Sequence, residues 1–345
     1  MKSDLGRHAW IMLAVILLEG CNASQAQIEP AALTQHVTQS GLMRISFLEQ
    51  NGVAQTLRNH RGQSWIARDA SRLKGPLLYV SDGGDNFLYV FSLPGGQLVE
   101  KITGFRAIAG LCSDKEGNVF VVDFDAASVK VFPHGRKEPT AVLNDPDAYP
   151  TGCSVDPTTG NLAVTNDITV TGSDMEEPGD VAIYKNAKGT PQDYADPNMV
   201  YVSSDSYDST GDLYVSGVAD SYQNSSFAVL YKGRSKLKDL TLNQSFSAYS
   251  LLQWDGQYLA VASENDAQMY RFKINGATGT KVGTTKLVGA SAVYGFWIQN
   301  NELYAAGVSN DQPMVGFYPY PRGGKPTKTL LGFSFALSAT VSVLP

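Results

Sequence analysis

A short hydrophobic segment recurs six times along the chain, and this repetition restricts the fold more than any other feature of the sequence. Each copy has four mostly apolar residues followed by Asp, Asn, Gly or Ser. The copies are Leu78–Asp82, Val119–Asp123, Leu162–Asn166, Leu213–Gly217, Leu259–Ser263 and Leu303–Gly307, and successive copies start 41 to 51 residues apart. A period of about forty residues with several short strands per repeat is typical of a β-propeller. We therefore expect an all-β chain that forms a six-bladed β-propeller.

The second repeat shows how one blade divides into strands. We expect an inner strand at 110–113, a second at 119–123, a third at 128–132 and a fourth at 140–143. Asp114–Asn118 should form a tight turn, because Asp accepts backbone hydrogen bonds and Gly readily adopts positive φ. The same kind of turn recurs at Asp156–Asn161 and Asp208–Asp212. Each repeat is therefore predicted to be a four-stranded antiparallel blade.

The two ends of the repeat region complement each other. The first copy follows Lys74-Gly75-Pro76, which gives it no convincing inner strand. The chain ends with Ala339–Val343, an inner-strand sequence that no blade follows. We expect this C-terminal strand to complete the first blade and close the ring, which removes the free sheet edges. The propeller domain is then predicted at 64–345.

A small residue stands near the start of each expected inner strand. These residues are Gly110, Gly152, Ser204, Ser250, Gly295 and Ser338. Inner strands converge on the propeller axis, and small residues there relieve crowding. The alternative interpretation is that they keep the mouth of a central channel open.

The N-terminus has the pattern of an export signal. Lys2 and Arg7 precede the apolar run Ala9–Leu18, which suits a signal peptide at 1–20 and is too short to span a bilayer. Leu18-Glu19-Gly20-Cys21 resembles a bacterial lipobox and predicts lipidation of Cys21, although Glu19 departs from the pattern. Cleavage after Ser24-Gln25-Ala26 is the alternative. Residues 21–63 are predicted to be a polar tether.

The repeats carry a family resemblance. Leu78–Asp82, and the longer segment Gly152–Asn166, resemble the repeats of NHL-type six-bladed propellers, in particular those of uncharacterised exported bacterial propeller lipoproteins. The resemblance covers residues 64–345. It implies the fold and a location in the cell envelope, and it brings no assigned activity with it.

Charge and histidine content argue against several functions. The net charge of −6 disfavours nucleic acid, which needs clustered Lys and Arg. The four histidines lie in the signal peptide, before the repeats or in the turn at 134, away from any expected channel mouth. A Ser-His-Asp triad would therefore lack its base. No Gly-rich phosphate loop is present either.

One face of the propeller should gather acidic residues, because the inner strands begin where the second strands end. The acidic and amide residues expected there are Asp82, Asp85, Asp123, Asp125, Asn166, Asp167, Glu264 and Asp266. Oxygen ligands of this kind suit a divalent cation such as Ca²⁺. Asp and Asn that merely end strands and form turns are the alternative interpretation. The insertion 167–180 is expected to be a solvated loop, with a calcium-stabilised loop or a partner contact as alternatives.

Aromatic residues are expected on the same face. Tyr149, Tyr249, Tyr294 and Phe296 lie at or beside the starts of inner strands. Such rings can recognise a sugar or peptide, because they bury area and, in Tyr, keep a polar tip. Ordinary packing in the core or rim is the alternative.

The three cysteines form two sets, a single residue near the N-terminus and a pair within the repeats. Cys21 is the candidate lipid site. Cys112 and Cys153 lie on adjacent inner strands and are a candidate disulfide in an oxidising compartment. Two buried free thiols remain the alternative, since a bridge needs closely spaced Cα atoms.

These observations favour a non-enzymatic function. We expect an exported, lipid-anchored monomer that acts as a scaffold in the bacterial envelope. It would bind an envelope protein or a small ligand, and would contact the membrane only through its lipid. No cofactor is expected, apart from a possible divalent cation. The alternative is a divalent-metal-dependent hydrolase, similar to lactonases of the gluconolactonase type, with an acidic central channel.

Overall fold

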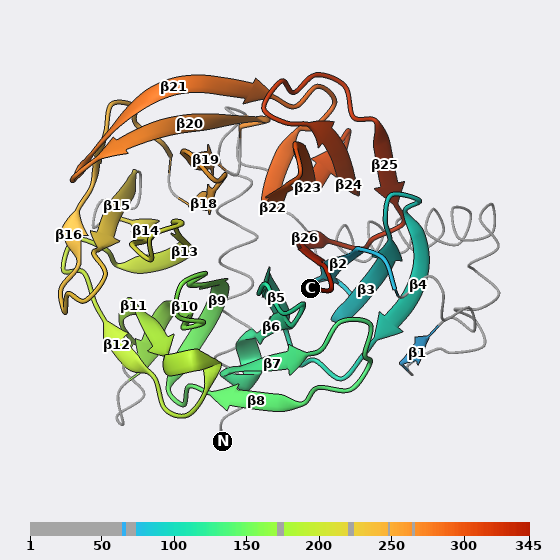
Figure 1. The fold of residues 1–345 in the computed structure, drawn as a ribbon, viewed down its shortest axis with the longest axis horizontal. Helices are drawn as coiled ribbons and strands as arrows, with labels where there is room; N and C mark the ends of the chain where they lie inside the picture. Colours follow the sequence, from blue (N-terminus) through green and yellow to red (C-terminus); the bar gives the residue numbers. More distant parts are fainter. Residues whose placement is uncertain (1–63, 67–73, 171–175, 220–223, 248, 264–265) are drawn as a thin grey trace, which may run out of the picture. The chain divides into compact units, whose positions relative to one another are not determined.

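A computed structural model describes residues 64–66, 74–170, 176–219, 224–247, 249–263 and 266–345. The predicted signal peptide, nearly all of the tether, Cys21 and Glu264 lie outside these residues. Over the described residues the strands form six antiparallel blades around one axis (Figure 1), so the predicted fold is confirmed. No helix in the described part of the chain has the length and apolar character needed to span a membrane.

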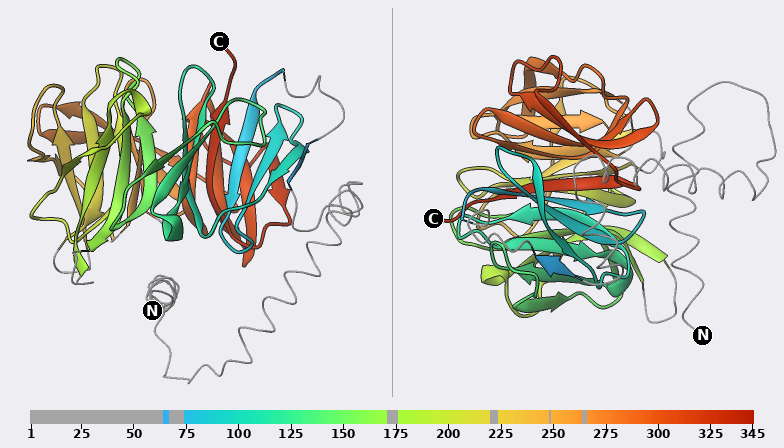
Figure 2. Two further views of the ribbon diagram at one scale, coloured as in Figure 1. Left: turned by 90° about the horizontal axis from the view of Figure 1, so that it is seen from below. Right: turned by 90° about the vertical axis from the view of Figure 1, so that its right-hand side faces the viewer.

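Among the first three blades, blade 1 combines the C-terminal strand with strands from the start of the propeller. From the axis outwards, blade 1 has β26 (Ala336–Ser342), β2 (Leu77–Asp82), β3 (Phe87–Ser92) and β4 (Gln97–Ile102). Blade 2 has β5 (Ile108–Ser113), β6 (Val119–Asp123), β7 (Ser128–Phe132) and β8 (Ala141–Asn144). Blade 3 has β9 (Ala148–Val155), β10 (Leu162–Val170), β11 (Glu176–Tyr184) and β12 (Gln192–Tyr194). Figure 2 shows the twisted blades from the side.

The remaining blades follow in sequence order. Blade 4 has β13 (Tyr201–Tyr207), β14 (Leu213–Val218), β15 (Ser225–Leu230) and β16 (Lys238–Asp239). Blade 5 has β18 (Ser250–Trp254), β19 (Leu259–Ser263), β20 (Gln268–Asn275) and β21 (Thr278–Lys286). Blade 6 has β22 (Ala292–Gln299), β23 (Glu302–Ser309), β24 (Gln312–Pro319) and β25 (Lys328–Leu331).

The ring closes as the sequence predicts. The C-terminal strand β26 pairs antiparallel with β2, with Leu78 opposite Val341 and Val80 opposite Ala339. All six copies of the recurring segment lie in the second strands of their blades. The second strand of blade 1 is buried along its whole length. This explains why the copies read as continuous apolar runs, since neighbouring blades cover both faces of each second strand.

The hydrophobic core lies between the blades. Leu78 and Tyr89 of blade 1 pack with Tyr304 and Phe317 of blade 6 in one buried cluster. Equivalent clusters join blades 1 and 2, blades 3 and 4, blades 4 and 5, and blades 5 and 6. The propeller is therefore stabilised by sheet-on-sheet packing around the ring, at about 25 cal/mol for each Å² of apolar surface buried.

Three local features differ from expectation. A fifth strand, β1 (Trp65–Ile66), extends blade 1 beyond β4, and β17 (Thr241–Leu242) pairs parallel with β21 in blade 5. The expectation of a loop at 167–180 is wrong for most of that segment. Strands β10 and β11 extend into it from either side, to Val170 and from Glu176, with Thr169 opposite Glu177, so the described part of the insertion lengthens two strands.

Candidate functional site

The inner strands carry β-bulges at one common level near the axis. In β9, β13, β22 and β26 a single extra residue interrupts the pairing with the second strand. In β5, Ala109 and Gly110 together lie opposite the single residue Val122. In blade 5, the residue equivalent to these bulge residues is Tyr249, which immediately precedes β18. The bulge-level residues are Ala109, Thr151, Ser203, Tyr249, Tyr294 and Leu337, one from each blade, and we call them the mouth ring. Because bulges re-aim side chains and occur often beside functional sites, this ring is the candidate site.

The mouth ring is chemically asymmetric. In blades 3 and 4 its members are small and tied down, because the Thr151 hydroxyl donates to the Val202 carbonyl at 3.4 Å and the Ser203 hydroxyl donates to the Ser250 carbonyl at 3.4 Å. Blades 5, 6 and 1 contribute Tyr249, Tyr294 and Leu337 instead, all half-buried. One half of the mouth ring is therefore compact, with Thr151 and Ser203 as its polar members beside Ala109, and the other half is apolar and aromatic.

The aromatic half of the mouth ring extends to the neighbouring aromatic side chain of Phe335. Phe335, which lies just before β26, packs against Tyr294 with ring centroids 4.9 Å apart. This contact exists because ring closure brings the C-terminal strand beside blade 6. In blade 3, Tyr149 makes a separate contact with Phe124 at 5.0 Å between ring centroids.

Tyr249 has an unusual backbone. Its φ of 62° lies in the left-handed region, which glycine adopts readily and a bulky residue does not. Such a conformation costs on the order of 1 kcal/mol and persists where the surrounding structure imposes it, often at a binding site. The mouth ring therefore contains a tyrosine with a strained backbone, in a conformation that glycine would adopt more easily.

The small residues of the inner strands allow close approach between blades. A Cβ atom added to Gly295 would lie 2.6 Å from the Leu337 carbonyl oxygen, and one added to Gly110 would collide with the Thr151 carbonyl oxygen. Ser204 instead uses its hydroxyl to accept a hydrogen bond from the Leu252 amide at 2.9 Å. These contacts favour the packing interpretation over an open channel mouth.

The expected acidic residues at strand ends act on the backbone. Both Asp82 and Asp123 are fully buried. Asp82 accepts hydrogen bonds from the amides of Ser334 at 2.9 Å and Phe335 at 2.8 Å, in the segment that leads into β26. Asp85 and Asp125, the next acidic residues expected on this face, follow Asp82 and Asp123 in the sequence. Asp125 is exposed.

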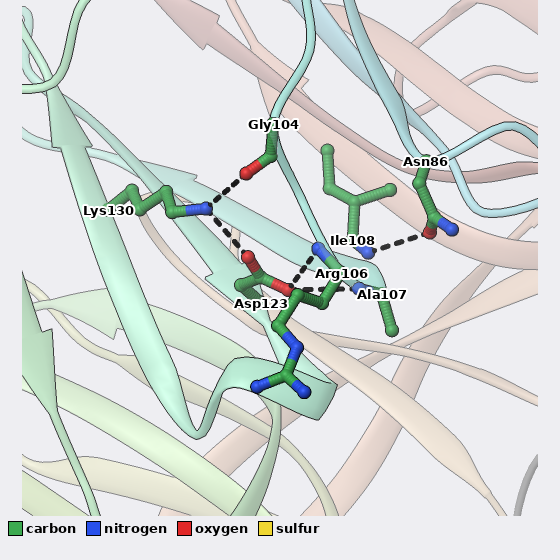
Figure 3. Close-up of polar contacts among 7 residues, drawn as sticks. All are labelled: Asn86, Gly104, Arg106, Ala107, Ile108, Asp123 and Lys130. Carbon is green, nitrogen blue, oxygen red and sulfur yellow. Dashed lines mark hydrogen bonds and ion pairs between the residues drawn. The ribbon is translucent and has the colours of Figure 1, made fainter. Parts of the chain in front are cut away.

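Asp123 makes the corresponding contacts in blade 2 (Figure 3). Its Oδ1 accepts hydrogen bonds from the amides of Arg106 and Ala107, both at 2.9 Å, just before β5. Its Oδ2 forms an ion pair with Lys130 Nζ at 2.7 Å, and this ammonium also donates to the Gly104 carbonyl. These carboxylates therefore hold the segments that enter the inner strands, and so position the mouth ring.

The third blade has Asn166 at the same position. The Asn166 Nδ2 donates to Asp145 Oδ2 at 2.9 Å and to Asp180 Oδ1 at 2.7 Å. Burial, opposed by this hydrogen bond and assisted by the charges of Asp193 and Asp145, raises the pKa of Asp180 to about 6. Burial likewise raises the pKa of Asp145. In blade 3, two carboxylates therefore accept hydrogen bonds from one side-chain amide. In blades 1 and 2, a single carboxylate instead accepts hydrogen bonds from backbone amides of a loop.

The other residues predicted for this face are Phe296, Asp167 and Asp266. Phe296 is buried in the core between blades 5 and 6 and does not belong to a surface site. Asp167 lies half-buried in β10, and Asp266 accepts a hydrogen bond from the Tyr270 hydroxyl at 2.6 Å. Within the described residues, His, Cys, Asp and Glu do not form a group of three that could hold a metal ion.

A disulfide joins Cys112 of β5 to Cys153 of β9, with 5.6 Å between the Cα atoms. It links the inner strands of blades 2 and 3 close to the mouth ring. The two strands approach this closely because Gly110 and Gly152 lie between them, so the glycines that relieve crowding also allow the bridge.

Ala109, Thr151, Ser203, Leu337 and Phe335 were not predicted from the sequence. A signal for four of them was present, since Ala109, Thr151, Ser203 and Leu337 each directly precede one of the small inner-strand residues. Recognising it required the bulges, which depend on strand pairing and cannot be read from the periodic pattern alone.

Comparisons with known proteins identify the fold only. No protein-family model and no curated protein matches the sequence. A chain from a nidogen–laminin complex is similar in structure, with a TM-score of 0.61 and 14% identity, over 78% of this chain and 99% of that one. A protein of unknown function from Bacteroides caccae gives a TM-score of 0.57 and 12% identity, with the same coverage of each chain. The chain therefore shares a propeller fold with these proteins, and fold similarity does not determine function.

Proposed function

We propose that this six-bladed propeller is an exported, lipid-anchored, NHL-type scaffold of the bacterial envelope that binds a partner protein through its mouth ring. The observation that carries the proposal is the aromatic half of that ring. Tyr249, Tyr294 and Phe335 provide large, stiff side chains, two of them with a polar tip, which is the composition of binding hot spots. The left-handed backbone of Tyr249 lowers stability, and we infer that the tyrosine is kept there because it binds the partner.

The partner should present an apolar or aromatic side chain with a nearby hydrogen-bonding group. Such a segment would meet Leu337 and the rings on one side, and the small polar half of the mouth ring on the other. The structurally similar chain from a nidogen–laminin complex supports this choice only by analogy of fold. The alternative hydrolase would require Asp82 and Asp123 to release their loop amides before either could bind a metal ion.

Photo-crosslinking tests the binding surface. With p-benzoylphenylalanine in place of Tyr294, illumination of intact cells should give one predominant adduct. The matched control places the same residue at Gln257, an exposed position in the β18–β19 turn at the opposite end of the inner strand. Absence of an adduct from position 294, or equal yield of the same adduct from position 257, would contradict a binding site at the mouth ring.

Lipid anchoring has its own test. Because a bilayer anchor depends on acylation of the cysteine, Cys21→Ser should move the protein from the membrane fraction to the soluble fraction. Mass spectrometry of the wild-type protein should find a lipidated N-terminal Cys21. An unmodified terminus at Gln27 would refute the anchor and leave the export proposal in place.

A further inference from the structure

The boundary between blades 2 and 3 contains a group of oxygen-bearing side chains that the proposed function does not use. Asp145 follows β8 in the last part of blade 2, and Asn166 and Asp180 lie directly opposite each other on β10 and β11 of blade 3. Asp193 on β12 is near enough for its charge to raise the pKa of Asp180. The group therefore joins the two blades that the disulfide also joins.

The negative charge of this group is not balanced by basic side chains. Among the described residues, no Lys, Arg or His forms an ion pair with Asp145, Asp180 or Asp193. Asp145 is 9% exposed and Asn166 is 1% exposed. Buried carboxylates are normally paired with a cation or coordinate one, because removing a charge from water is costly.

A second observation comes from the amide of Asn166. Its Oδ1 is buried and makes no hydrogen bond, whereas its Nδ2 lies within hydrogen-bonding distance of both carboxylates. A half-turn of the amide exchanges these two atoms. Oδ1 would then lie between Asp145 Oδ2 and Asp180 Oδ1. In that orientation Oδ1 would take the place of Nδ2, which lies 2.9 Å from Asp145 Oδ2 and 2.7 Å from Asp180 Oδ1, and oxygens this close to one another can share one hard cation.

We propose that Asp145, Asn166 and Asp180 bind a calcium ion between blades 2 and 3. Ca²⁺ fits better than Mg²⁺, because it accepts amide and carboxylate oxygens in flexible geometry and completes its shell with water. Asp193 adds negative charge beside the site. The ion would stabilise the seam between the two blades, and this role does not depend on whether the mouth ring binds a partner.

Thermal unfolding of the full chain tests the site. After treatment with EDTA, added Ca²⁺ at a hundredfold excess over its Kd should raise the Tm of the wild type by roughly 5 °C. Asp180→Asn preserves the shape of the side chain and should abolish this rise. Asp125→Asn, at an exposed carboxylate of blade 2, should leave it unchanged. No rise in the wild type, or an equal rise in both variants, would overturn the proposal.

A spectroscopic measurement covers the case in which Asp180→Asn does not fold. Tyr184 is fully buried, and its hydroxyl donates to the Asn144 carbonyl at 3.2 Å, directly before Asp145, which places its ring near the site. Tb³⁺ bound in place of Ca²⁺ should show emission sensitised by this tyrosine. Tyr184→Phe should remove most of that emission, and Ca²⁺ should displace Tb³⁺ from the wild type. Unchanged emission in Tyr184→Phe would refute the location.

Discussion

Removing the Cys112–Cys153 disulfide should lower the free energy of unfolding by about 4 kcal/mol. The two cysteines are separated by 41 residues, and a cross-link of that span removes chain entropy from the unfolded state by approximately this amount. The bridge also holds β5 against β9, where Gly110 and Gly152 allow the strands to approach. We expect Cys112→Ala/Cys153→Ala to fold with the same blades and to unfold at lower denaturant concentration.

Guanidinium unfolding with and without dithiothreitol provides the measurement. The reductant should lower the midpoint of the wild type and should have no effect on the double variant, which controls for any other action of the reagent. Peptide mapping without reduction should recover Cys112 and Cys153 in one linked species. Free thiols at both positions in the oxidised protein would show that the bridge does not form.

Much of the propeller could be predicted from the sequence, because its physical causes are repeated. Second strands buried on both faces must be apolar throughout, so six copies of one pattern appear in the sequence. Closure by the C-terminal strand could be deduced because 339–343 had no blade of its own and the strand at 78–82 had no inner neighbour. The Asp-initiated turns were also predictable. The Asp208 side chain accepts hydrogen bonds from the amides of Thr210 and Gly211, as such a turn requires.

The site was harder to predict, since it depends on strand register. The mouth ring consists of residues at inner-strand bulges, and a bulge is a mismatch between two strands that one strand's sequence does not reveal. The expected acidic face illustrates the same difficulty. Asp82 and Asp123 do lie at strand ends, but their partners are amides at 334–335 and 106–107, in the segments that lead into β26 and β5. The extension of β10 to Val170 and of β11 from Glu176 was missed because the acidic composition of 167–180 suggested a loop.

These contacts divide the polar and aromatic residues of this face by role. The strand-end carboxylates of blades 1 and 2 fix the segments that lead into the inner strands. The bulges then form the mouth ring, whose aromatic half we propose as the contact with a partner. The strand-end carboxylates Asp82 and Asp123 therefore have a structural role.

Asp123→Ala should therefore be strongly destabilising, by about 3–5 kcal/mol. The substitution leaves Lys130 without its 2.7 Å carboxylate partner, and breaking a buried ion pair from one side has a cost of this size. It also leaves the amides of Arg106 and Ala107 without their acceptor in a region where Ala107 is buried. Asp123→Asn should be less damaging, because its Oδ1 can still accept from both amides.

The structural role of Asp123 is tested by the free energy of unfolding of Asp123→Ala, measured in urea beside that of Asp125→Ala. Asp125 is exposed and two residues away, so its replacement should change the free energy by less than about 0.5 kcal/mol. We predict a loss of about 3–5 kcal/mol for Asp123→Ala and almost none for the control. Equal and small losses in the two variants would contradict the structural role of Asp123, and would return this carboxylate to the set available for a ligand.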